Sequence, residues 1–162
     1  MSTPTPDEVR EFTLLLGSAP RLIAPWDVYG EMITPILTGK QTGKSLSVFE
    51  VVTQPKWGPP LHVHHREDEA FYVLEGRYLF EYGEKLVEAG AGSYLFLPRG
   101  VGHTYQNIGE TAGKNMVVAA PSGVEFFFEE LSKITGPPDM AKIGPVFNHW
   151  GMELLGPPIS LR

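Results

Sequence analysis

The chain has 162 residues, 42% hydrophobic and 20% charged, as expected of a folded single domain rather than a disordered chain. Its net charge of −6, without a lysine or arginine cluster, excludes a basic surface that would bind nucleic acid or anionic lipid. The absence of cysteine excludes disulfides, thiolate nucleophiles and cysteine-ligated metal sites. The N-terminus lacks a targeting signal and no apolar run could span a membrane, so we expect a cytoplasmic protein with no nucleic-acid or membrane partner.

Glycine and proline recur 18 and 15 times and separate short apolar runs without a fixed period. This spacing predicts many short strands, arranged as a barrel or sandwich, rather than a few long helices. We expect one domain over 1–162, with an N-terminal arm over 1–18 and a barrel over about 20–121. The link over 39–44 is expected to be a hairpin loop. The predicted strands are 34–38, 45–53, 61–65, 69–75, 77–82, 85–89, 93–97, 103–107 and 114–120.

One helix is predicted after the barrel, over 122–136. Ser122 and Glu125 have the spacing of a capping box, in which each side chain satisfies a free amide at the helix start. Gly136 and the two prolines after it end the helix. The tail over 137–162 is expected to pack back on the domain. An apolar stripe that would cover the barrel is formed by Val124, Phe127, Phe128 and Leu131.

Three of the five histidines lie within four residues of one another. Residues two apart on a strand face the same side, so His62 and His64 project together, whereas His65 points to the surface or lies behind them. Glu69 begins the next strand, and His103 begins a strand after a turn rich in proline and glycine. Three imidazoles and one carboxylate could meet inside a barrel and leave one or two open positions on a six-coordinate ion. The alternative is a group of exposed or hydrogen-bonded histidines.

Two spaced motifs resemble those of the cupin superfamily. They read His62-x-His64-x4-Glu69-x6-Gly76 and Gly92-x5-Pro98-x-Gly100-x2-His103-x3-Asn107. The resemblance implies an all-β, double-stranded β-helix (cupin, jelly-roll) barrel with a C-terminal helix. It also implies that His62, His64, Glu69 and His103 ligate a metal ion.

The first motif departs from the cupin pattern at one position. The glycine expected six residues before His62 is replaced by Lys56. We expect the nearby Gly58 to serve the turn instead.

A finer resemblance links the chain to single-domain bacterial cupins grouped with quercetin 2,3-dioxygenase. It is carried by segment 58–76, the phenylalanine-rich helix and segment 152–158. It implies a divalent iron, manganese, nickel or cobalt ion, with zinc also compatible, and O2 as co-substrate. In that family the carboxylate ligand, here Glu69, also takes the 3-hydroxyl proton of a flavonol, whose heterocycle O2 then cleaves.

Two other functions stay open, a cupin isomerase that uses the metal as a Lewis acid and a metal-binding sensor of a small molecule without turnover. Single-domain cupins commonly pair, so the resemblance also implies a homodimer.

The remaining predictions concern side chains around the donor cluster. Phe71 and Val73 share strand parity with Glu69, and Tyr105 with His103, so these three are expected to line the substrate pocket. The alternative is that they form ordinary barrel core. His149 is expected on the surface of the tail, and residues 66–68 are expected to form a solvated corner.

Overall fold

The computed structural model describes Gly17 and residues 20–162. The predicted arm over 1–18 therefore falls almost entirely outside the described residues. Within the described part, no helix is both long enough and apolar enough to cross a membrane.

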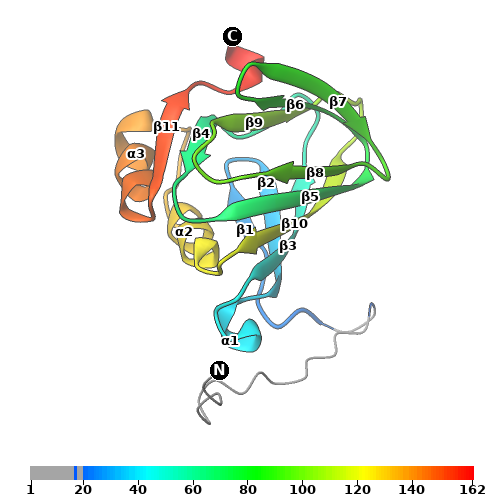
Figure 1. The fold of residues 1–162 in the computed structure, drawn as a ribbon. Helices are drawn as coiled ribbons and strands as arrows, with labels where there is room; N and C mark the ends of the chain where they lie inside the picture. Colours follow the sequence, from blue (N-terminus) through cyan, green and yellow to red (C-terminus); the bar gives the residue numbers. More distant parts are fainter. Residues whose placement is uncertain (1–16, 18–19) are drawn as a thin grey trace.

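Two antiparallel sheets face one another and form the predicted all-β jelly-roll barrel (Figure 1). All nine predicted strands are present, although several boundaries shift by one to three residues. Two strands were not predicted, β1 at the start and β11 in the tail. In order across the first sheet lie β1 (Trp26–Val28), β2 (Glu31–Leu37), β3 (Ser47–Thr53), β10 (Gly113–Ala120), β5 (Asp68–Glu75) and β8 (Tyr94–Leu97). In order across the second lie β11 (Met152–Gly156), β4 (Leu61–His64), β9 (His103–Asn107), β6 (Arg77–Tyr82) and β7 (Lys85–Gly90).

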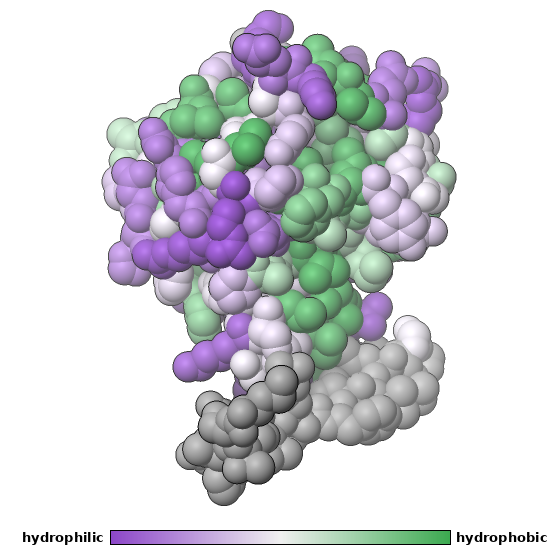
Figure 2. Space-filling view, in the orientation of Figure 1, coloured by the Kyte–Doolittle hydropathy of each residue, from purple (hydrophilic) through white to green (hydrophobic). Residues whose placement is uncertain are grey.

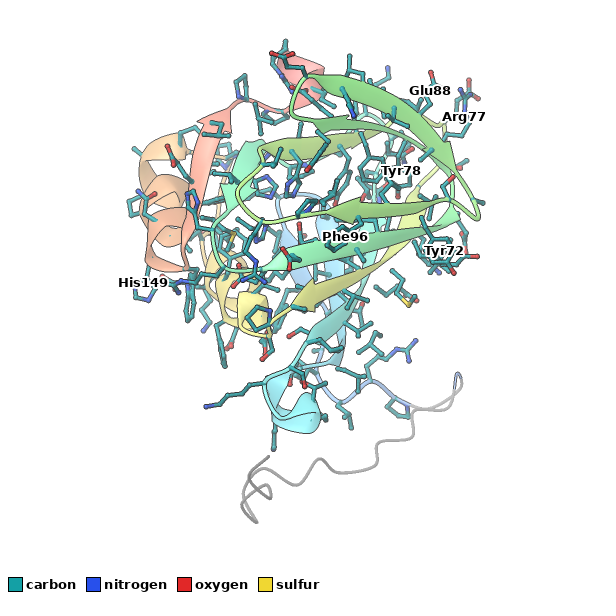
Figure 3. The ribbon with its side chains drawn as sticks, viewed as in Figure 1. Tyr72, Arg77, Tyr78, Glu88, Phe96 and His149 are labelled. Atoms are coloured by element: carbon teal, nitrogen blue, oxygen red, sulfur yellow. The ribbon has the colours of Figure 1, made fainter. Side chains whose placement is uncertain are left out.

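Alternation along the strands fills the barrel with large side chains. Strand β3 has the burial pattern of a half-buried strand, with every second residue inside. Phe71, Phe80 and Tyr105 meet in the centre at ring-centroid distances of 5.4 to 5.6 Å. Tyr78, labelled in Figure 3, is completely buried in the same layer. These contacts tie both sheets into one core, as close aromatic packing does in protein interiors.

The outer face of the first sheet also carries apolar side chains (Figure 2). Tyr94 is 78% and Phe96 65% exposed on edge strand β8, and Met116 on β10 is 37% exposed. Tyr94 stacks on Tyr72 of β5 with ring centroids 4.4 Å apart. The homodimer expected from the sequence stays a prediction.

The strands β2 and β3 pair antiparallel, so the predicted hairpin is present, and its loop contains a one-turn helix, α1 (Gly39–Thr42), that was not predicted. Thr38 and Gln41 form a capping box there, with Gln41 Oε1 accepting from the Thr38 amide at 3.0 Å. The turn is therefore held by hydrogen bonds within the segment.

Helix α2 (Val124–Leu131) presents the predicted apolar stripe to the barrel, but its predicted start and end were wrong. Its N-cap is Gly123, and the Ser122 amide donates to the Lys44 carbonyl at 3.3 Å rather than to Glu125. The Glu125 carboxylate accepts from the Gly39 amide at 2.9 Å, from Ser47 Oγ at 2.6 Å and from the Gly123 amide at 2.7 Å. Glu125 thus fastens α2 to α1 and β3. After Leu131 the hydrogen bonds tighten to an i→i−3 pattern, and the helix ends five residues earlier than predicted.

The tail packs back on the barrel, as predicted, and forms structure of its own. Helix α3 (Met140–His149) is capped at its N-terminus by Asp139, whose side chain accepts from the Ala141 amide at 3.0 Å. Strand β11 then pairs with β4, placing Met152 opposite His64 and Leu154 opposite His62. A final 3-10 turn covers Ile159–Leu161.

Candidate metal centre

Four side chains from three strands converge between the two sheets. His62 and His64 project from β4, and His103 lies directly across from His62 on β9. Glu69 approaches from β5 of the other sheet. One donor atom from each of the four lies within 4.8 Å of the others. The structure therefore brings together all four predicted metal ligands.

The cluster is tight and largely shielded from solvent. Glu69 Oε2 lies 2.9 Å from His103 Nε2 and 3.5 Å from His64 Nε2. The His62 and His103 rings are 4.7 Å apart between centroids. None of the four residues is more than 8% exposed. Phe147 of α3 packs edge-on against His62 at 5.8 Å between ring centroids, so the tail helps to shield the cluster.

Each histidine is oriented by an acceptor behind its ring. His62 Nδ1 donates to the Pro60 carbonyl at 2.7 Å, and His103 Nδ1 donates to the Val101 carbonyl at 3.3 Å. His64 Nδ1 lies 3.3 Å from Glu67 Oε2. A proton held on Nδ1 leaves the Nε2 lone pair free, which is the form of histidine that binds metals.

The local charges favour an ionised carboxylate in the cluster. Burial opposes the charge on Glu69, but His64, His103 and His62 outweigh it and lower its pKa to about 2. Burial also opposes charge on His64, yet Glu69 and Glu67 raise its pKa. Burial and the neighbouring imidazoles lower the pKa of His62 well below its usual value. The site thus offers an anionic oxygen donor at Glu69, and the lowered pKa of His62 keeps that ring neutral.

This donor set fits a divalent first-row transition metal. Three imidazole nitrogens and one carboxylate oxygen suit iron, manganese, cobalt, nickel and zinc alike. The four donor atoms lie within 4.8 Å of one another, as the ligands of a single ion must. The residues that would hold the ion are His62, His64, Glu69 and His103.

The corner over residues 66–68 is only partly solvated, and the prediction was wrong for Glu67. This side chain is 5% exposed because it turns inward to His64. Asp68 instead pairs with Arg99, which donates to it from the backbone amide at 2.9 Å and from Nη2 at 2.8 Å. His65 is exposed, 3.4 Å from Glu153, and His149 lies exposed at the end of α3 (Figure 3).

Lys56 itself makes the turn for which the cupin pattern has glycine. Its φ is +65°, in the left-handed region, so the expectation that Gly58 would take this role was wrong. Gly58 is needed for another reason, because a Cβ there would overlap the Tyr105 carbonyl. The segment therefore lies close against β9, which carries His103.

One cavity contains the donor cluster and extends between β2, β3, the loop at Trp57 and the two C-terminal helices. Phe71 and Tyr105 line it as predicted, whereas Val73 does not line it and is fully buried in the core. The prediction of a cavity-facing Val73 was therefore wrong, because it lies one strand repeat deeper than Phe71. Much of the remaining wall is apolar, formed by Val28, Ile33, Phe49, Val51, Val117, Phe127, Phe128, Leu131, Ile143 and Phe147.

A second carboxyl group in this cavity was not predicted. Glu31, at the start of β2, lines the cavity and is 8% exposed. Burial raises its pKa, although hydrogen bonds from Tyr105 and Thr53 oppose the rise. In the sequence, the only available signal was an acidic residue two positions before Ile33, on the side of β2 that faces the barrel.

The segment that contains the four donors is similar to a known protein family. Residues 49–119, which include all four, match the family described as the cupin domain. An uncharacterised protein of Methanocaldococcus jannaschii is 31% identical over 61 residues, covering 38% of this chain and 49% of that protein. The chain spans about half the length of the curated relatives it matches.

Solved structures agree with this assignment at the level of the fold. An RmlC-like cupin from Shewanella frigidimarina has a TM-score of 0.59 at 18% identity, covering 72% of this chain and 97% of that one. KdgF from a Halomonas species has a TM-score of 0.58 at 17% identity, covering 64% of this chain and 93% of that one. Residues 49–119 thus match the cupin domain family, and the chain has the cupin jelly-roll fold.

Proposed function

We propose that the chain is a metal-dependent dioxygenase acting on a planar aromatic or enolisable small molecule of the flavonol type. The observation that supports this proposal is one cavity lined both by the four metal donors and by aromatic side chains. A cavity of this kind accommodates a flat apolar molecule and keeps water away from the reacting atoms.

Each part of the site has a role in this proposal. A bound divalent metal would supply Lewis acidity and an open position for a substrate oxygen. His62, His64 and His103 would hold the ion through Nε2, with their rings fixed from behind by Pro60, Glu67 and Val101. Glu69 is ionised at neutral pH because its pKa is about 2, as required of a ligand or of the acceptor for an enol proton.

The apolar wall favours this substrate class over a sugar, which is the type of substrate expected for a cupin isomerase. A sugar carries several hydroxyl groups, and burying each of them costs free energy unless it finds a hydrogen-bond partner. Apart from the donor cluster, the described lining offers only four side chains that can hydrogen-bond: Tyr29, Glu31, Trp57 and Tyr105.

The test is oxygen uptake by protein loaded with iron, manganese, cobalt or nickel, measured with a panel of flavonols and β-diketones. We expect uptake that requires both metal and substrate and that is lost in His103→Ala. His65→Ala is the matched control, since His65 is exposed and outside the cluster. Product formed without O2 would indicate an isomerase, and tight binding without product would indicate a sensor. Either result would overturn the proposal.

A further inference from the structure

The Glu31 carboxyl lies in the same cavity as the metal donors, yet the proposed reaction does not use it. Glu31 faces Thr53 across the β2–β3 pair, and Tyr105 approaches it from the other sheet. A buried carboxylate costs free energy unless its oxygens accept hydrogen bonds. The hydrogen-bond donors around Glu31 therefore determine which of its two oxygens can accept from a ligand.

The two oxygens of Glu31 are used unequally. Oε1 accepts from Tyr105 Oη at 2.7 Å and from Thr53 Oγ1 at 2.8 Å. No donor among the described residues makes a hydrogen bond to Oε2. The protein thus fixes the carboxyl group through one oxygen and leaves the other as an acceptor in a cavity whose wall is largely apolar.

Tyr105 gives the position of this acceptor relative to the metal donors. It follows His103 by two residues on β9 and faces the same side, about 7 Å further along the strand. Its side chain then reaches Glu31. A ligand that contacts both the donor cluster and Glu31 must therefore extend past the Tyr105 ring.

We propose that Glu31 Oε2 accepts a hydrogen bond from a hydroxyl group at the end of the substrate remote from the metal donors. This inference rests on the proposed function and narrows its substrate class to planar molecules with a ring hydroxyl at that end. A hydroxyl has one donor hydrogen, which matches one free oxygen. An ammonium group has three and would leave two without a partner at Oε2.

The variant Glu31→Gln tests this geometry directly. Tyr105 and Thr53 both donate to the position of Oε1, so the amide oxygen of glutamine takes that position. The amide NH2 group then replaces Oε2, and an acceptor becomes a donor. The matched control is Glu50→Gln on β3, where Glu50 lies on the opposite face of the sheet from the buried Phe49 and Val51.

The probes are p-cresol and p-xylene, which have similar shapes and differ by one hydroxyl group. We would titrate each into the full-length protein and follow binding by NMR. We expect the wild type and Glu50→Gln to bind p-cresol about ten-fold more tightly than p-xylene. In Glu31→Gln the hydroxyl can only accept from the neutral amide NH2, a weaker hydrogen bond than donation to a carboxylate, so that preference should fall to about two-fold or less. An unchanged ratio, or no preference in the wild type, would overturn the inference.

A second variant, Glu31→Asp, covers the case in which glutamine does not fold. Aspartate keeps the charge but withdraws the acceptor by one methylene group, so the preference for p-cresol should again fall. Turnover separates this inference from the proposed reaction. If flavonols are turned over but the p-cresol preference is absent, only the Glu31 assignment fails. If the preference is present but no flavonol reacts with O2, only the proposed reaction fails.

Discussion

Glu67 Oε2 lies 3.3 Å from Nδ1 of His64, on the opposite side of that ring from Glu69. Glu67 is buried, and its carboxylate is one of the two that raise the pKa of His64. The carboxylate can hold a proton on Nδ1, keep the ring in place and make Nε2 a stronger donor. We therefore expect Glu67 to position His64 for metal binding.

Replacing Glu67 with alanine should weaken metal binding by about 10- to 100-fold, since a ligating histidine would lose its outer partner. Glu67→Gln should recover much of the affinity because an amide oxygen still accepts from Nδ1. Competition with a chelator measures both variants. The control is Glu153→Ala, because the Glu153 carboxylate lies 3.4 Å from His65, which is exposed and outside the donor cluster. Equal affinity in Glu67→Ala and wild type would show that Glu67 does not position His64.

Metal content should depend on the four donors and not on neighbouring histidines. Purified protein should carry about one divalent ion per chain, and His62→Ala or His103→Ala should lose most of it. His65→Ala should keep wild-type content because its ring is exposed and paired with Glu153. Elemental analysis checks all four samples. Undiminished metal in both cluster variants would contradict the assignment of the centre.

The barrel and the four donors could be predicted because their signals lie in short segments. Strand parity places His62 and His64 on one side, and the turns at Gly76 and Gly100 take positive φ values of 93° and 81°. Glu67 could not be predicted from parity, since it lies in a corner and is buried only because His64 Nδ1 faces it. Its position depends on the folded cluster rather than on local sequence.

The tail was predicted least well, for two physical reasons. Helix α3 contains Gly144 and Pro145, which usually interrupt helices, and it is stabilised by burying Val146 and Phe147 against the barrel. Strand β11 ends in glycine and prolines, and its pairing with β4 joins residues about 90 positions apart.

Glu31 was missed because an acidic residue at a strand start resembles an exposed edge position. Its hydrogen bonds come from two other strands.

The pairing of Asp68 with Arg99 predicts a loss of stability in acid. Arg99 donates to Asp68 from its backbone and side chain, which lowers the pKa of Asp68 from 3.8 to about 2. A lowered folded-state pKa stabilises the protein above the unfolded value, and this contribution is lost as pH falls from about 4 through 2. Asp68→Asn should therefore be less stable than wild type at pH 7, with the difference shrinking below pH 4.

Urea unfolding from pH 7 to 2.5 measures that difference. Glu84→Gln is the control, because Glu84 is exposed in the turn between β6 and β7. A stability difference that stays constant over this range would show that the pair contributes nothing that titrates with Asp68.

Gly113 should be intolerant of a side chain because it lies against Tyr78. A Cβ at this position would come within 2.7 Å of Tyr78 Cζ, and Tyr78 is completely buried. Gly113→Ala should cost about 1–3 kcal/mol of unfolding free energy through overpacking. Gly90→Ala is the control, since nothing lies within 4 Å of its added Cβ. A Gly113→Ala protein as stable as Gly90→Ala would contradict this close approach.

The last prediction separates two roles of Glu69, as metal ligand and as proton acceptor. Glutamine keeps the size of the side chain but removes its charge and basicity. If Glu69 acts chiefly as a base, Glu69→Gln should retain most of the metal and lose turnover by about 10²–10⁴-fold. If it acts chiefly as a ligand, metal content and activity should fall together, and added metal should restore part of the activity. The measurement is turnover per bound ion, with metal assayed on the same samples as activity. Unchanged turnover per ion would exclude Glu69 as the base.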